Sequence, residues 1–326
     1  MAEREITTPV DLCLPGGRLD PDAVGWSRRP LHRANLRGWG RAKRWEYWGV
    51  VTPRLCLGVV ASSLGYAGVC SVWVLDRETG RTWSHEEVPP LARGVALAPG
   101  VGGRTLVEAG RLRIELADAP GGTGAPGGVV VRASAPGIEV DLAVGAGGEC
   151  VGVVVPWSTR RFQYTVKDVA RSVTGRVVLE GTPYDVTEGW AVLDHGRGKW
   201  PYAITWNWAA GSSERVGITL GGKWTDGTGL TENALFVDGR AHKIGEELAW
   251  EYDRTDWRRP WRIHGPRVDA RLEPFHERVD KTNLGVVANE THQCFGRFSG
   301  WAATDDGERV PLDGLVGWAE EARNRW

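Results

Sequence analysis

The chain has 326 residues, 41% of them hydrophobic and 25% charged, which supplies enough apolar material for a large packed core and excludes a disordered protein. Its 40 Lys and Arg nearly balance 41 Asp and Glu, so the net charge of −1 gives no electrostatic reason to expect nucleic acid or an acidic membrane as a partner. Tryptophan is abundant, with 18 residues against 5 Phe and 6 Tyr. An indole is large and flat and carries one N–H donor, so it suits both cores and ligand-binding walls.

The cysteines and the first residues indicate the cellular setting. The cysteines are scattered, odd in number and include no CxxC pair: Cys13, Cys56, Cys70, Cys150 and Cys294. This pattern predicts neither a disulfide framework nor a zinc site, and a reducing cytoplasm is the expected location. The opening MAEREITTPVDL lacks the apolar run of a secretory signal, and we expect no membrane-spanning segment.

The segment 25–48, GWSRRPLHRANLRGWGRAKRWEYW, combines several Arg and Trp residues. Such a combination can stack on nucleic acid bases. The overall charge is balanced, however, and no nucleic-acid-binding motif matches. We therefore expect a packing arm that crosses a β-barrel and forms Arg–carboxylate pairs, and no nucleic acid partner.

Most of the chain consists of short apolar or alternating runs separated by Gly, Pro, Asp and Asn. These runs lie at 47–62, 68–83, 104–119, 127–144 and 232–245. Turn signals such as VDGRAH occur at the spacing of hairpins, so the pattern predicts a mostly β protein of antiparallel meanders or barrels. The last segment, DGLVGWAEEARNRW, differs because Leu315, Trp318 and Ala319 follow helical spacing, and a short C-terminal helix is expected there.

A domain boundary is expected near 165–181, TVKDVARSVTGRVVLEG, where a new strand pattern begins at about the middle of the chain. This divides the chain into an N-terminal β-barrel-like domain with its arm at 1–168 and a C-terminal β-barrel-like domain at 169–326. The oligomeric state is left open.

The central segment 193–211, LDHGRGKWPYAITWNWAAG, carries the clearest chemistry. Read as two strands joined by a turn at 195–201, it places Asp194 and His195 on opposite faces, because side chains alternate along a strand. Asp194 shares its face with Trp190 and lies beside a stripe of aromatic residues formed by Tyr202, Trp206 and Trp208. Two interpretations remain: Asp194 faces a pocket, or it pairs with Arg197 or caps the turn.

The motif AVLDHGRG…WNW resembles the signature of the AttH and carotenoid 1,2-hydratase group. The whole chain more closely resembles the bacterial family of domain of unknown function 2804, through GWSRRPL, KRWEYW, VVPWSTRRFQYTVK, VTGRVVLEG, LDHGRGKWPYAITWNWAAG, TENALFVDG and HQCFGRFSGW. The broader group implies two lipocalin-like antiparallel β-barrels packed side by side. Its members include enzymes that add water to isoprenoid double bonds and fungal cyclases that guide Diels–Alder reactions. None uses a tightly bound redox cofactor.

The resemblance places Asp194 and His195 at the acid–histidine pair and Trp206 and Trp208 at the strand aromatics, while Arg197 departs from the pattern. From these positions and the strand pattern we expect Asp194, His195 and Arg197 to be catalytic. Lys167 is expected to be a salt-bridge partner rather than a base. The expected substrate-binding residues are Trp157, Tyr164, Lys167, Trp190, Trp200, Tyr202, Trp206, Trp208, Glu232 and Asn233.

The leading functional hypothesis is a cofactor-independent enzyme acting on a hydrophobic or amphipathic small molecule by hydration, cyclisation or isomerisation. A carboxyl group buried among tryptophans is driven towards its neutral form and can donate a proton, while indole faces stabilise a carbocation. Asp194 would be that acid.

Two alternatives stay open. A barrel can hold a small ligand without any chemistry, which would make the protein a carrier. Trp platforms also bind sugars, and Asp194 with Glu232 could form the carboxylate pair of a glycoside hydrolase. No metal and no cofactor are expected, since the histidines lack metal-binding spacing and no dinucleotide-binding or nucleophile-elbow motif occurs.

Overall fold

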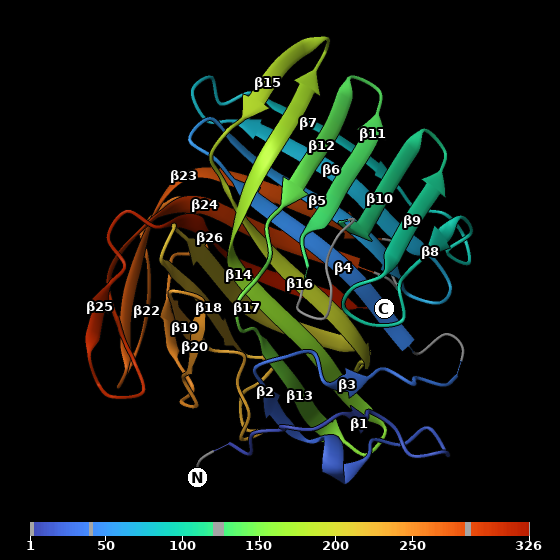
Figure 1. The fold of residues 1–326 in the computed structure, drawn as a ribbon, viewed down its shortest axis with the longest axis vertical. Coiled ribbons are helices and arrows are strands. Elements are labelled where there is room, and N and C mark those ends of the chain that lie inside the picture. Colours follow the sequence, from blue (N-terminus) through green and yellow to red (C-terminus); the bar gives the residue numbers. More distant parts are fainter. Residues whose placement is uncertain (1–2, 39–41, 120–126, 284–287, 326) are drawn as a thin grey trace.

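The structure, a computed structural model, describes residues 3–38, 42–119, 127–283 and 288–325. Two large curled sheets, of 14 and 10 strands, contain most of these residues and lie against each other (Figure 1). The predicted mostly β architecture of two barrel-like antiparallel sheets is confirmed. In the described ranges, no helix is long and apolar enough to cross a membrane.

The first sheet has the strand order β7-β6-β5-β4-β16-β14-β12-β11-β10-β9-β8, with β13 and β15 pairing with the two halves of β14 and β2 pairing with β13. Its strands are β2 (Gly25–Ser27), β4 (Ala42–Val51), β5 (Leu55–Ser63), β6 (Gly68–Asp76), β7 (Thr82–Glu87), β8 (Val95–Ala96), β9 (Arg104–Ala109), β10 (Leu112–Asp118), β11 (Val129–Ala135), β12 (Ile138–Val144), β13 (Val151–Ser158), β14 (Arg161–Leu179), β15 (Thr182–Val186) and β16 (Trp190–Lys199).

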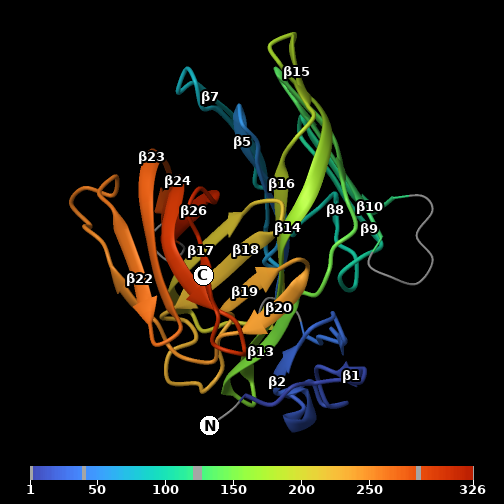
Figure 2. The same ribbon diagram turned by 60° about the vertical axis from the view of Figure 1, so that its left-hand side comes forward.

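The second sheet has the order β20-β19-β18-β17-β26-β24-β23-β22-β21, with β25 beside β24. Figure 2 shows it next to the lower part of the long strand β14. Its strands are β17 (Ala203–Ser212), β18 (Val216–Gly222), β19 (Ala234–Val237), β20 (Arg240–Lys243), β21 (Ala249–Glu251), β22 (Trp261–Gly265), β23 (Val268–Asn283), β24 (Ala288–Ala303), β25 (Arg309–Pro311) and β26 (Val316–Arg325).

The expected C-terminal helix is wrong, because its residues form β26. This strand pairs with β17 on one side and with β24 on the other over its whole length. A helical spacing of three apolar residues is a weak signal in a short segment. Two neighbouring strands supply backbone partners along the whole segment, and this long-range pairing overrides local propensity.

The expected boundary between residues 168 and 169 falls inside β14, a single continuous strand. After it, β16 still pairs with β14 and β4 in the first sheet. The chain passes to the second sheet only between β16 and β17. Both halves of β14 pair with strands of the first sheet. The strand also contacts β17 and β18 of the second sheet, and the Ala170 amide in its middle donates to Ser212 Oγ at 3.1 Å.

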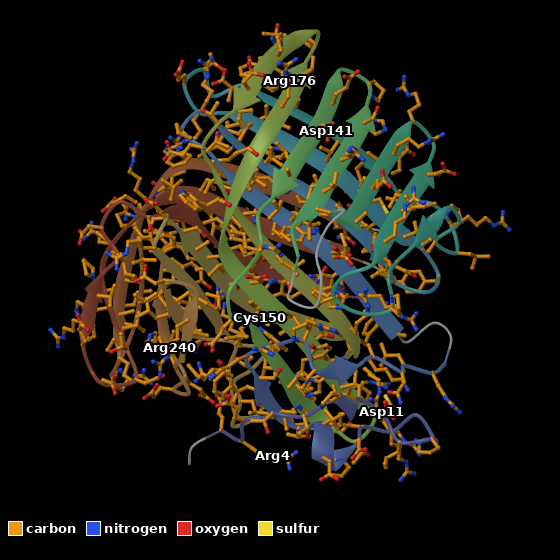
Figure 3. The ribbon with its side chains drawn as sticks, in the orientation of Figure 1. Arg4, Asp11, Asp141, Cys150, Arg176 and Arg240 are labelled. Atoms are coloured by element: carbon orange, nitrogen blue, oxygen red, sulfur yellow. The ribbon has the colours of Figure 1, made fainter. Side chains whose placement is uncertain are left out.

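Strand alternation distributes side chains between separate cores. On β16, Leu193 packs inside the first curled sheet, whereas Val192 packs in the core between the sheets. A third core fills the second sheet. On the outer face of the first sheet, Arg132 Nε lies 3.0 Å from Asp141 Oδ1, and Arg176, labelled in Figure 3, carries its charge next to that pair. The first sheet thus buries apolar side chains in its interior and against the second sheet, and it carries charged side chains where its outer face is exposed.

The N-terminal residues form an arm along the lower edge of the molecule. It contains β1 (Val10–Asp11), a 3-10 turn η1 (Pro21–Ala23) and β3 (His32–Arg33), besides β2. Arg28 Nη1 lies 2.8 Å from Glu149 Oε2, as expected for an arm held by Arg–carboxylate pairs. The expected arm at 25–48 is wrong in its last part, because the residues from Ala42 form β4 between β5 and β16. Trp26 packs with Trp200 and Trp224 in a cluster that lies behind the site described next.

Candidate functional site

A cavity of about 560 Å³ lies between the two sheets. The first sheet contributes side chains from β4, β5, β14 and β16 to its wall, and the second contributes side chains from β17, β23, β24 and β26. Cavities of this size hold a small organic molecule. The location follows from the fold, because the two facing sheets meet along β14, β16 and β17 and separate further along their strands.

Five tryptophans line one end of this cavity: Trp45, Trp200, Trp206, Trp208 and Trp224. Trp200 is at their centre, with its ring stacked on Trp224 at 5.8 Å and edge-on to Trp45 at 5.4 Å. Trp157 packs behind Trp200 and donates from Nε1 to the Trp224 carbonyl at 2.8 Å. Aromatic rings in mutual contact hold one another in place, so the wall is rigid and mostly apolar.

Gly196 makes room for this wall. A Cβ atom at this position would lie 2.1 Å from Trp45 Cε2 and 2.6 Å from Gln163 Nε2. Gly196 is the cross-strand partner of Trp45 on β4, so the absence of a side chain lets the indole lie across β16 next to Asp194. The glycine that follows Asp194-His195 in the sequence is therefore explained by close approach of a tryptophan.

A buried ion cluster lies against the tryptophans. Lys167 and Asp194 are cross-strand partners on β14 and β16, and Lys167 Nζ lies 2.9 Å from Asp194 Oδ1 and 3.3 Å from Glu232 Oε2. The ammonium group also sits 3.9 Å from the centre of the Trp208 ring, a cation–π contact. Thr165 Oγ1 donates to Asp194 Oδ1 at 3.1 Å.

The charges in this cluster determine its protonation. Burial alone would lower the pKa of Lys167, but the charges of Asp194 and Glu232 outweigh burial and raise it. Burial raises the pKa of Glu232, and the charge of Lys167 only partly opposes this. One cation cannot compensate two buried carboxylates, so the cluster favours Lys167 paired with Asp194 and an additional proton on Glu232.

A further carboxyl group, Glu320, enters the cavity from β26. Trp206 Nε1 donates to its Oε1 at 2.9 Å, and Gln293 Nε2 donates to its Oε2 at 2.9 Å. Both donors are uncharged N–H groups. Burial raises the pKa of Glu320 to about 7, although the Trp206 hydrogen bond and the charge of Lys167 oppose the shift.

The structure brings some of the expected site residues into the cavity and leaves others outside it. Those in the wall are Lys167, Asp194, Trp200, Trp206, Trp208 and Glu232. Trp190 lies at the edge of the core between the sheets, and Tyr202 is 50% exposed. Asn233 holds its own loop, since its Oδ1 accepts from the Gly221 amide at 2.6 Å.

His195, Arg197 and Tyr164 lie on the faces of β16 and β14 that point away from the cavity, and Tyr164 packs against the N-terminal arm with its ring 4.6 Å from that of His32. The turn expected at 195–201 is wrong, because β16 continues to Lys199, so alternation turns Arg197 away from Asp194. Arg197 donates to the carbonyls of Trp45 and Ala98, each at 2.7 Å. Burial, with the charge of Arg197, lowers the pKa of His195 far below its usual value. This placement does not support catalytic roles for His195 and Arg197.

Several lining residues were not singled out from the sequence, among them Trp45, Tyr47, Gln163, Trp224, Gln293 and Glu320. The alternation in KRWEYW was a usable signal, since it places Trp45 and Tyr47 on one face of β4. Glu320 was hidden by the helix prediction. Read as a strand, the same residues would have placed Glu320 on one face with Trp318.

Comparisons with known proteins agree with this fold. A putative AttH from Nitrosomonas europaea has 13% sequence identity and a TM-score of 0.55, and the match covers 86% of this chain and 92% of that chain. CghA with Sch210972 has 12% identity and a TM-score of 0.54, with 88% of this chain and 89% of that chain covered. Kievitone hydratase from Nectria haematococca has 10% identity and a TM-score of 0.50, also with 88% of this chain and 89% of that chain covered. At these identities the similarity establishes the lipocalin-like fold of the AttH group and not the chemistry.

No curated protein sequence matches the chain. The model of the family described as Domain of unknown function (DUF2804) matches residues 3–326, which confirms the resemblance found in the sequence. The chain belongs to the DUF2804 family.

Proposed function

We propose that this protein is a cofactor-independent enzyme that modifies a hydrophobic or amphipathic small molecule by acid–base catalysis in the cavity between its sheets. The observation that carries the proposal is the buried Lys167–Asp194–Glu232 cluster against a wall of five tryptophans. Hydration, cyclisation and isomerisation are reactions of this kind. One of the structures of similar fold is a hydratase, which supports hydration as one of the candidate reactions.

The cavity suits a reaction that passes through a positively charged intermediate. Indole faces attract cations through their ring quadrupole, and Trp208 already does so with Lys167. The apolar wall also limits water, which strengthens every electrostatic contact inside it.

The contact with Lys167 favours a charged role for Asp194, in place of the neutral acid expected from the sequence. Lys167 and Thr165 both contact Oδ1, and no described residue donates to Oδ2. That second oxygen is available to a ligand. We propose that it stabilises positive charge that develops on the substrate.

The carbohydrate alternative gains no support from this geometry. A glycoside hydrolase places its two carboxyl groups on either side of the scissile bond. Asp194 and Glu232 instead contact one ammonium group, at 2.9 and 3.3 Å, so Lys167 occupies the space between them. The carrier hypothesis differs from the enzyme only in turnover, and the experiment below separates the two.

The test starts with native mass spectrometry of the freshly purified protein to detect a bound small molecule. A panel of isoprenoid alcohols and enones is then incubated with the protein in D2O, and deuterium uptake or addition of water is measured by liquid chromatography–mass spectrometry. Asp194→Asn is expected to lower turnover by about 10²–10⁴-fold. Tryptophan fluorescence should show binding within about threefold of wild type, because the apolar wall is unchanged.

Asp185→Asn is the matched control, because Asp185 pairs with Arg176 on the outer face of the first sheet. It should leave turnover unchanged. Turnover by Asp194→Asn at the wild-type rate contradicts the role of Asp194. Binding of panel compounds by wild type without any turnover supports the carrier and contradicts the enzyme.

A further inference from the structure

We propose that Glu320 is the catalytic proton donor of this cavity and hands its proton to the substrate while Asp194 stays paired with Lys167. The inference rests on the proposed function and assigns the acid to a different residue and a different sheet. Glu320 comes from β26 of the second sheet and Asp194 from β16 of the first, and both line the same cavity.

The hydrogen bonds of Glu320 leave its acid proton available. Trp206 Nε1 can only donate, and Gln293 contacts the carboxyl group through its Nε2, which also donates. Each carboxyl oxygen therefore accepts one N–H, and neither partner offers an acceptor for the proton of the neutral acid. A ligand in the cavity can take up that proton.

The surroundings of Glu320 keep its neutral form accessible. Its side chain is 7% exposed, and burial, assisted by the negative charge of Asp194, raises its pKa to about 7. Asp194 is in direct contact with a cation. The two carboxyl groups therefore have contrasting partners, a cation for Asp194 and uncharged N–H donors for Glu320.

The step balances in atoms and electrons. The O–H bond of Glu320 breaks, and the electron pair of a substrate C=C bond forms a C–H bond with the proton. The neighbouring carbon is left positive and is stabilised by indole faces and the Asp194 carboxylate. Water then adds through an oxygen lone pair, and the surplus proton returns to the Glu320 carboxylate, which restores the acid. Loss of a carbon-bound proton to the same carboxylate, in place of water addition, gives an isomer.

The experiment uses the D2O panel with Glu320→Gln, which keeps shape and hydrogen bonding but has no acid proton. Turnover should fall by about 10²–10⁴-fold with little change in binding. Wild-type kcat/KM should fall as pH rises through about 7, where Glu320 loses its proton. Glu320→Asp should recover part of the turnover and keep a pH-dependent limb.

Infrared spectroscopy supplies a readout that does not depend on substrate. In wild type, the C=O band of protonated Glu320 should be present below pH 7 and lost above it. Glu320→Gln should lack this contribution and keep the bands of other buried carboxyl groups whose pKa burial raises, Glu232 and Asp168. Glu321→Gln is the control, since Glu321 is the adjacent buried glutamate and lies outside the cavity wall. Its folded fraction should keep both turnover and the band.

The outcomes separate the two proposals. If wild type is active and Glu320→Gln is equally active, or if wild type and Glu320→Gln show the same carboxyl bands below pH 7, the role of Glu320 is overturned and the enzyme stands. If wild type labels and converts no panel compound, the proposed function and the role of Glu320 are both overturned.

Discussion

Glu320 and Glu321 are consecutive residues of β26 that lie in two contrasting regions, the cavity wall and the opposite face of the second sheet. Among the described residues, the donors to Glu320 are the uncharged groups of Trp206 and Gln293, and burial raises its pKa to about 7. Glu321 is also buried, which by itself would raise its pKa, but hydrogen bonds from Lys223, Tyr252 and Arg254 lower it to about 2.

The same contrast occurs on β16, where Asp194 faces the cavity and His195 faces the interior of the first sheet. Because side chains alternate along a strand, neighbours in sequence enter separate electrostatic environments. Residues on the cavity faces can reach a ligand, whereas those on the opposite faces are enclosed by the protein. Along the same strand, residues that face the cavity are therefore expected to affect turnover, and their neighbours on the opposite face are expected to affect stability. The following predictions test this division.

The largest effect on stability is expected from Glu321→Gln. Removing the carboxylate leaves Lys223 and Arg254 without their buried partner, and we expect a loss of about 3 kcal/mol in the free energy of unfolding at neutral pH. Because the folded pKa of Glu321 lies below the ordinary value of 4.5, its contribution is present above pH 4.5 and disappears as pH falls towards 2. Urea unfolding at neutral and acidic pH measures both effects. Equal stability of variant and wild type at pH 7 would contradict the structural role.

Glu320→Gln is expected to act on stability in the opposite sense. The folded pKa of about 7 lies above the ordinary 4.5, so wild type loses stability as pH rises from 4.5 to about 7, and this loss levels off at higher pH. A glutamine has no buried charge to form, so the variant should be more stable than wild type above pH 7 by about 1–3 kcal/mol, and nearly equal to it below pH 4.5. Thermal unfolding measured from pH 4.5 to pH 8 tests whether the variant becomes the more stable protein as pH rises. A variant less stable than wild type at pH 8 would contradict the prediction.

Gly196→Ala should disturb the tryptophan wall. The new Cβ would meet Trp45 Cε2 at 2.1 Å, and the indole would have to move away from β16. Forcing an extra group into a packed site costs about 1–3 kcal/mol. Urea unfolding measures the cost, and binding of panel compounds should weaken with it. Gly16→Ala is the control, because a Cβ there meets nothing within 4 Å.

The smallest effect is expected from His195→Gln. His195 is fully buried with neither ring nitrogen hydrogen-bonded, and it lies outside the cavity wall. We expect turnover in the D2O panel within about threefold of wild type and a stability change of about 1 kcal/mol or less. A loss of turnover as large as that expected for Asp194→Asn would return His195 to the site and break the division between the two faces of β16.

Much of the site follows from local patterns. The period of two separates Asp194 from His195, and it groups Trp206 with Trp208 on one face of β17. The same pattern in the segment before β16 marks Lys167 as a charged residue on a half-polar strand, where the structure places an ion pair. These predictions succeed because alternation depends only on extended backbone geometry.

Other parts of the site depend on contacts between residues far apart in the chain. The register of β14 against β16 puts Lys167 opposite Asp194, and the segment before β19 brings Glu232 to the same ammonium group. No local pattern encodes either contact.

The sequence by itself therefore determined the antiparallel β architecture, the family and the face on which each residue of the central strands lies, because these follow from backbone period and motif. The tertiary structure decided that the last segment is a strand, that the cavity lies between the sheets, and that Glu320 and Asp194 share it. Each of these depends on which strands pair and how the two sheets meet, and such long-range contacts are settled by the packing of the whole chain.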